Sequence, residues 1–183
     1  MSTSKLLGAL GTMSVLGACS VMPPQEFPRE SRVDVDRYMG DWYVIAHIPP
    51  SKTENAYNSV ETYTRGDGNK INTRFTFREG SFTGEEQEMN PTGFVQEESN
   101  GAVWGMQLIW PVRMEYTISH VSPDYQNTIV ARSARDYVWI MAREPMIDPS
   151  TYDMLVNKVA SLGYDTSKLR RVPQQSMSER NDR

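Results

Sequence analysis

The chain has 183 residues, 38% of them hydrophobic, and a formal net charge of -4, which fits a single globular domain. Its acidic balance, with no run of Lys or Arg longer than a pair, excludes the basic surface of a nucleic-acid-binding protein. One cysteine, Cys19, and two histidines, His47 and His120, exclude an intrachain disulfide and a structural zinc site. We therefore expect no nucleic-acid partner, no metal and no cofactor.

The first nineteen residues have the features of an export signal. Lys5 is followed by an uncharged stretch from Leu6 to Ala18, too short to remain in a bilayer as a spanning helix. The end of this stretch resembles the lipobox of bacterial lipoproteins, which implies cleavage after residue 18 and acylation of Cys19 on sulfur and nitrogen. Ser20 then favours sorting to the outer membrane, by the same resemblance. The alternative is an ordinary signal peptide that contains a cysteine.

Residues 19–31 are mostly polar or proline, with Pro23, Pro24 and Pro28, and are expected to form an extended tether. The domain is expected to follow over residues 32–173. In this tether arrangement the domain stands clear of the lipid.

The segment Val33 to Ala46 is expected to lead into the first strand. Gly40 allows a sharp turn, and Trp42 opens a run of β-branched and aromatic residues. Both faces of this strand are apolar, so we expect it to be covered on both sides.

Short alternating segments separated by turn residues continue to the end of the strand region, which predicts an all-β sandwich or barrel. With the first strand they make eight. The remaining seven are 58–64, 71–77, 85–95 (interrupted at Asn90-Pro91), 103–109, 114–120, 127–132 and 137–143.

One helix is predicted after the strands. Asp148 is its expected N-cap, Pro149 its first residue and Gly163 its end, with Tyr152, Leu155, Val156 and Val159 forming an apolar stripe. The polar tail 174–183 is expected to be disordered.

Three short motifs resemble those of the lipocalin family, in its bacterial outer-membrane form. They are Gly40-Asp41-Trp42, Ser122-Pro123-Asp124-Tyr125 and the stretch from Asp136 to Pro145. The resemblance covers roughly residues 33–173 and implies an eight-stranded up-and-down antiparallel barrel with one C-terminal helix packed on it. It also implies that Gly40, Trp42, Asp124, Tyr125 and Arg143 are structural, with Arg143 lying over Trp42 in a cation–π contact. Pro123 stands where the family usually has threonine, so this turn is expected to differ in detail.

The interior of such a barrel either fills with side chains or holds one small ligand. The inferred inward positions are apolar and aromatic, and the lipocalin resemblance favours a cavity over a dry core. The predicted ligand-binding residues are Phe75, Phe77, Trp104, Met106, Leu108, Tyr116, Ile118 and Trp139, with Ile71, Met114, Tyr137 and Met141 on the same inner faces.

The open end is expected among residues 48–57, 110–113 and 133–136 and near Arg78. Four arginines there are candidate contacts for a phosphate or carboxylate head group, namely Arg78, Arg113, Arg132 and Arg135. The alternative is that they are solvated rim charges. His120 is placed at an inward position, as a hydrogen-bonded barrel residue rather than a haem ligand.

No enzyme motif is present: there is no nucleophile elbow, no phosphate loop and no metal-ligand spacing. We therefore interpret the chain as a non-enzymatic lipid carrier, anchored in the outer membrane and facing the periplasm. Its expected ligands are fatty acids or lysophospholipids, and its expected role is membrane maintenance. Two alternatives stay open, a lipocalin-fold enzyme acting on an isoprenoid or lipid and a structural envelope lipoprotein with a filled barrel. A homodimer also stays open.

Overall fold

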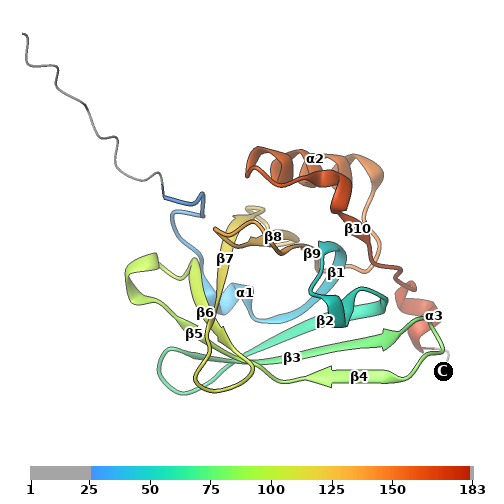
Figure 1. Ribbon diagram of the computed structural model, residues 1–183, viewed down its shortest axis with the longest axis horizontal. Helices are drawn as coiled ribbons and strands as arrows, with labels where there is room; N and C mark the ends of the chain where they lie inside the picture. The colour runs from blue at the N-terminus through green and yellow to red at the C-terminus, as the bar shows by residue number, and fades with distance from the viewer. Residues whose placement is uncertain (1–25, 182–183) are drawn as a thin grey trace, which may run out of the picture.

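A closed antiparallel barrel forms the body of the molecule (Figure 1). The computed structural model describes residues 26–181, and within them the first barrel strand, β1 (Gly40–Ile48), pairs with the last, β9 (Val138–Ala142). Between them lie β2 (Ala56–Arg65), β3 (Lys70–Glu79), β4 (Glu86–Met89), β5 (Thr92–Val95), β6 (Val103–Gln107), β7 (Met114–Val121) and β8 (Asn127–Ala131).

The predicted eight-stranded barrel is confirmed. Consecutive strands pair around the barrel, with one exception: β5 pairs with β3 instead of with β4, and β4 also pairs with β3. The strands β4 and β5 therefore act as one barrel strand, broken at Asn90-Pro91, because proline cannot donate a ladder hydrogen bond. The predicted signal peptide, Cys19 and most of the expected tether lie outside the described residues. For residues 26–31 the expectation of a free tether is wrong, because they hydrogen-bond to the barrel: Ser119 donates to Pro28 O at 2.8 Å, and the Glu30 backbone donates to Ile118 O at 3.0 Å.

One end of the barrel is closed by a short helix that the sequence analysis did not predict. This helix, α1 (Val35–Tyr38), begins at Asp34, whose side chain accepts hydrogen bonds from the backbone of Asp36 and Arg37. In Figure 1 it lies within the ring of strands. Tyr38 at its end is fully buried.

Helix α2 (Pro149–Ser161) lies outside the barrel, as predicted (Figure 1). Asp148 caps it by accepting a hydrogen bond from the Thr151 backbone, and Gly163 follows its end with a φ of 87°. Its buried residues Leu155 and Val159 pack in a second apolar cluster with outward-facing residues of β1, β8 and β9. These strands are thus covered on both faces, as the apolar residues on both faces of the first strand indicated.

The C-terminal segment completes the wall between β1 and β2. These two strands pair only from Gly40 to Tyr43 on β1. Beyond that, β10 (Arg170–Arg171) pairs with Ala46 and His47, after the short turn η3 (Thr166–Lys168). The Asn58 backbone then donates to Pro173 O at 2.8 Å. The segment therefore bridges the two strands where they separate.

The expectation of a disordered tail is wrong for residues 174–181. The Gln174 side chain donates to Val44 O at 2.7 Å and to Ser59 O at 3.0 Å, and so joins β1 to β2. A short helix, α3 (Met177–Asn181), follows. A polar segment is ordered here because its side chains hydrogen-bond to backbone carbonyls of β1 and β2 where these strands separate.

Candidate functional site

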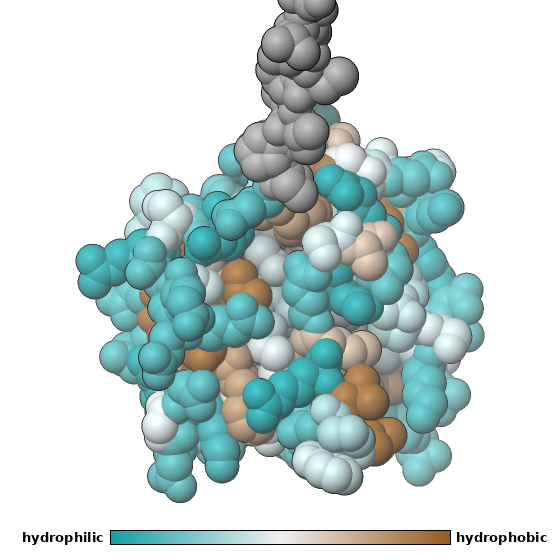
Figure 2. All heavy atoms as spheres, turned by 60° about the vertical axis from the view of Figure 1, so that its left-hand side comes forward, coloured by the Kyte–Doolittle hydropathy of each residue, from teal (hydrophilic) through white to brown (hydrophobic). Residues whose placement is uncertain are grey.

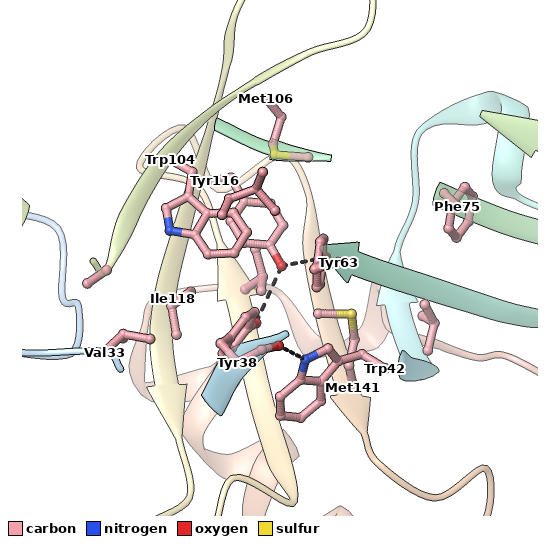
Figure 3. Close-up of a cluster of buried hydrophobic side chains, with 14 of the residues drawn as sticks. Val33, Tyr38, Trp42, Tyr63, Phe75, Trp104, Met106, Tyr116, Ile118 and Met141 are labelled. Atoms are coloured by element: carbon pink, nitrogen blue, oxygen red, sulfur yellow. Dashed lines mark hydrogen bonds between the residues drawn. The ribbon is translucent and has the colours of Figure 1, made fainter. Parts of the chain in front are cut away.

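A layer of stacked aromatic side chains forms the floor of the barrel interior (Figure 3). The rings of Trp104 and Tyr116 stack with centroids 5.2 Å apart, and Tyr63 meets both edge-on. The Trp42 indole donates to Tyr38 O at 2.8 Å. Trp42 and Trp104 are fully buried, so this end of the barrel is solid.

Arg143 lies over Trp42 at the closed end. Its guanidinium carbon is 3.9 Å from the centroid of the Trp42 ring. The same group donates to Asp41 O at 2.7 Å and to Met39 O at 2.8 Å. Gly40, with a φ of 94°, makes room, because a Cβ there would be 3.3 Å from the arginine. One cation therefore ties the end of β9 to the start of β1.

The turn between β7 and β8 lies at the same end. Asp124 accepts hydrogen bonds from the Ser122 hydroxyl at 2.5 Å and from the Gln126 backbone at 3.1 Å. Tyr125 has a φ of 61°, and its hydroxyl accepts from the Asp34 backbone at 2.8 Å. Pro123 is accommodated because the hydrogen bond that closes the turn runs from Tyr125 to Ser122 O.

Above the aromatic floor is a cavity of about 200 Å³, which we call the cup. Most of the side chains that line the cup are apolar. The complete lining consists of Pro50, Lys52, Thr53, Glu61, Tyr63, Phe75, Met89, Pro91, Met106, Leu108, Met114, Tyr116, Trp139 and Met141.

Five of the eight predicted ligand-binding residues line the cup: Phe75, Met106, Leu108, Tyr116 and Trp139. The other three predicted residues do not line the cup. Trp104 and Ile118 are fully buried in the floor. Phe77 borders a separate hollow formed with Asn58 and Gln175.

The structure places none of the four predicted head-group arginines in the lining of the cup. Arg78 donates to Glu86 at 3.1 Å and also borders the hollow next to Phe77. Arg113 lies 3.6 Å from the Phe94 ring centroid. Arg78 and Arg113 therefore contact residues outside the lining of the cup.

Arg132 and Arg135 stabilise the region where the β8–β9 connection meets the C-terminus of α2. Arg132 forms an ion pair with Asp136 at 2.8 Å. Arg135 donates to Leu162 O at 2.8 Å and so caps the C-terminus of α2. The basic residue that does line the cup is Lys52, on the short helix η1 (Ser51–Thr53) between β1 and β2.

Glu61, the one carboxylate that lines the cup within the described residues, is not among the predicted site residues. Its Oε2 atom is buried and has no hydrogen-bond partner there. Burial raises the pKa of Glu61 to about 8, because a charged carboxylate is poorly solvated in this apolar setting. Its position two residues before the inward-facing Tyr63 is the signal that places it on the inner face.

The predicted inward position of His120 is wrong. The register of β7 against β8 shifts between Ile118 and His120, so the residues after this bulge change face. The His120 imidazole lies 3.4 Å from Glu30, on the N-terminal segment outside the barrel. Burial and the nearby Lys158 on α2 lower the pKa of His120.

The mouth of the cup lies between η1 and the β6–β7 loop, residues 108–113. This loop and the start of β7 expose large apolar side chains to an unusual degree: Trp110 is 84% exposed, Ile109 72% and Val112 63%. Leu108 and Met114, which line the cup, are also partly exposed. The apolar lining of the cup therefore continues outward onto the loop. By contrast, hydrophilic residues predominate over much of the face shown in Figure 2.

Within residues 26–181, none of the helices combines the length and apolar character needed to cross a membrane. The same part of the chain contains no group of three or more His, Cys, Asp or Glu residues suited to a metal ion.

Comparisons with known proteins agree on one family. A family model described as a lipocalin-like domain matches residues 33–174. Temperature-induced lipocalin-1 of Arabidopsis thaliana is 31% identical over 148 residues, covering 78% of this chain and 80% of the relative. The outer membrane lipoprotein Blc of Escherichia coli strain K12 is 26% identical over 163 residues, covering 87% of this chain and 90% of the relative. Insecticyanin from the tobacco hornworm Manduca sexta superposes with a TM-score of 0.63 at 16% identity, covering 85% of this chain and 87% of that one.

Proposed function

The chain belongs to the lipocalin family, whose members bind small hydrophobic ligands, and we propose that it carries fatty acids or lysophospholipids in its cup while anchored in the outer membrane. The observation that carries this proposal is an apolar cup with a solid floor and an open mouth. Its volume of about 200 Å³ suits one slender chain rather than a bulky ligand.

The membrane attachment rests on Cys19. Four relatives are named outer membrane lipoprotein Blc, at 22–26% identity, which supports acylation of the cysteine that ends the lipobox-like sequence. More than one acyl chain gives stable anchoring where one does not. In this proposal the domain faces the periplasm and takes part in membrane maintenance.

The path of the N-terminal segment supports the same orientation for anchor and mouth. Glu30 donates to Ile118 O near the closed end of β7, and Pro28 O accepts from Ser119. The Phe27 ring lies 5.3 Å from Arg135, which belongs to the β8–β9 connection at the mouth end. From residue 30 back to residue 27 the chain therefore runs toward the mouth.

Cys19 lies only seven positions before Glu26. Fully extended, these seven positions span at most about 25 Å, so an acylated Cys19 keeps the mouth close to the bilayer. The exposed apolar β6–β7 loop is then directed at the same lipid surface. A lipid can pass from bilayer to cup along a continuous apolar path.

The two other hypotheses receive less support. A cavity of about 200 Å³ argues against a structural lipoprotein with a filled barrel. An enzyme acting on an isoprenoid or lipid needs reacting groups in the cup, where Glu61 and Lys52 are the ionisable candidates besides the two tyrosines. Turnover of a candidate lipid by the purified protein separates carrier from enzyme.

Tryptophan emission tests the binding site, because Trp139 lines the cup. Dodecanoic acid and a lysophosphatidylcholine are titrated into the full chain carrying Cys19→Ala, which has no acyl chains of its own. We expect a saturable change at one ligand per chain. Met106→Glu, which places a charge in the cup, should weaken binding at least about tenfold.

The matched control is Met154→Glu, because Met154 is 41% exposed on α2, away from the cup. The Met154→Glu variant should bind both ligands as tightly as the protein with Met154. A flat titration, or equal weakening by both variants, would contradict binding in the cup.

The anchor is tested by fractionation. Cys19→Ala removes the sulfur that accepts the diacylglyceryl group, so the protein should lose its acyl mass and leave the outer-membrane fraction. Retention of the unacylated protein in that fraction as an integral component would contradict the proposed anchor.

A further inference from the structure

A chain of hydroxyl groups runs beneath the cup, and its direction can be assigned (Figure 3). Thr128 donates its single hydroxyl proton to His120 O at 2.8 Å. Tyr38 must therefore donate to Thr128 at 3.2 Å, and Tyr116 to Tyr38 at 3.4 Å. Tyr63 then donates to Tyr116 at 2.7 Å. The proton of the last hydroxyl, on Tyr63, thus points toward Tyr116.

Glu61 therefore receives no proton from its nearest polar neighbour. A hydroxyl has one proton, so Tyr63 cannot donate to both Tyr116 and Glu61. Oε2 of Glu61 is buried without a hydrogen-bond partner among residues 26–181, and the side chain lines the cup. Neutral Glu61 can donate its one proton to the oxygen of Tyr63, its hydrogen-bonding neighbour, which leaves Oε2 as an unused acceptor in an otherwise apolar space.

An alkyl end packed against Glu61 would leave a buried polar group unpaired, which weakens binding. A ligand hydroxyl at the same place would donate to Oε2 of Glu61 and remove that loss. At the mouth, by contrast, Lys52 provides a cation near the solvent. The cup therefore has a hydrogen-bonding group just above its floor, a positive charge at its rim and apolar walls between.

We propose that the cup selects amphiphiles with a polar group at each end: an uncharged oxygen, such as a hydroxyl, hydrogen-bonds Glu61, and an anionic group stays at the mouth near Lys52. This inference rests on the proposed function and narrows its ligand class. Its simplest members are fatty acids that carry a hydroxyl at the end opposite the carboxylate.

The test compares two probes of equal length, dodecanoic acid and 12-hydroxydodecanoic acid, by calorimetry on the full chain with Cys19→Ala. At about pH 6, where Glu61 is neutral, the hydroxy acid should bind at least about tenfold more tightly. Glu61→Leu should reverse this order, because the floor then becomes apolar. Glu61→Gln should keep the preference, since an amide oxygen still accepts a hydrogen bond from the ligand hydroxyl.

Thr73→Val is the matched control. Thr73 Oγ1 is also buried without a partner in the described residues, but it does not line the cup. Its removal should leave the preference unchanged. An unchanged preference in Glu61→Leu would assign the hydroxyl to another group and overturn the inference.

The pH dependence gives a second measurement that does not rely on Glu61→Leu folding. Above about pH 8 Glu61 ionises, and the ligand hydroxyl then donates a stronger, charge-assisted hydrogen bond to the carboxylate, so the preference should rise in the native sequence and stay constant in Glu61→Gln. The ionisable groups around it are Tyr63, Tyr116 and Tyr38, whose pKa values burial raises, and Lys52 at the rim. The tyrosines stay protonated through this range. An equal change of preference in both proteins, or no change in either, would contradict a role for Glu61.

The outcomes separate the two proposals. Saturable binding of dodecanoic acid without any preference for the hydroxy acid overturns only this inference. Binding of neither acid, together with no binding of lysophosphatidylcholine, overturns the lipid-carrier proposal itself.

Discussion

Trp42 contacts both α1, the helix that closes the barrel, and Arg143 at the end of β9. Its indole donates to Tyr38 O on α1, and its ring face meets Arg143 at the end of β9. The ring is fully buried and lies below the cup rather than in its lining. This residue therefore contributes to stability and not to ligand choice.

Trp42→Ala should lower the free energy of unfolding by about 3–5 kcal/mol, because it removes a buried aromatic ring from a packed layer. Urea unfolding measures this change. Trp110→Ala is the matched control, since Trp110 is 84% exposed, and it should leave the unfolding midpoint almost unchanged. An unaltered midpoint in Trp42→Ala combined with lost ligand binding would make Trp42 a cup residue.

Glu61 makes stability depend on pH in a specific direction. Its pKa is raised to about 8 in the folded protein by burial, above its unfolded value near 4.5. The folded state thus holds a proton that the unfolded state releases, and folding loses stability as pH rises between these values. Glu61→Gln removes this dependence, so the variant should gain stability relative to the native sequence as pH increases from 4.5 to about 8. Parallel unfolding curves across this range would contradict a neutral Glu61.

Alternation along the strands predicts which way a side chain points, but not how deep it lies. Phe75 and Met106 line the cup, as predicted, whereas Trp104 lies on the same inner face of β6 as Met106 and belongs to the floor. Glu61 was missed because a carboxylate in a strand suggests a solvent-facing position. His120 was misplaced because a bulge in β7 changes the face, and the sequence has no clear signal for it.

At the scale of elements, strong local signals identified the strands and α2. The Asp148 cap, Pro149 and Gly163 fix the helix by local chemistry alone. The C-terminal segment was missed for the opposite reason. Its order comes from hydrogen bonds to β1 and β2, more than a hundred residues earlier, which composition cannot reveal.

Gln174→Ala tests whether this segment supports the barrel wall. The substitution leaves the carbonyls of Val44 and Ser59 without the donor that joins them, and the expected loss is about 1–3 kcal/mol of unfolding free energy. Chemical unfolding provides the measurement, with the exposed Ser178→Ala as control. If both variants unfold at the same denaturant concentration as the native sequence, the bridge between β1 and β2 carries no stability.

At the scale of the molecule, the exposed β6–β7 loop and the N-terminal segment both lie toward the mouth. A contiguous apolar loop beside a ligand cavity is typical of an interaction surface. Together with an acylated Cys19, it would direct the cup toward the lipid from which its ligand comes.

The double variant Ile109→Ser, Trp110→Ser should bind lipid vesicles about tenfold less tightly than the native loop, measured in the Cys19→Ala chain by vesicle sedimentation. Ligand binding from solution should persist, because neither side chain lines the cup. Met154→Ser serves as the control for an exposed methionine on α2. Unchanged vesicle binding, with a smaller particle size in gel filtration, would instead assign the loop to a homodimer interface.

Native mass spectrometry of the protein released gently from its membrane shows whether the cup carries a lipid. We expect one noncovalent lipid per chain, with a mass that fits a single acyl chain, retained at low collision energy and absent from the Met106→Glu variant. A protein that carries no lipid under these conditions, or that carries the same lipid after Met106→Glu, would contradict a lipid carrier that uses this cup.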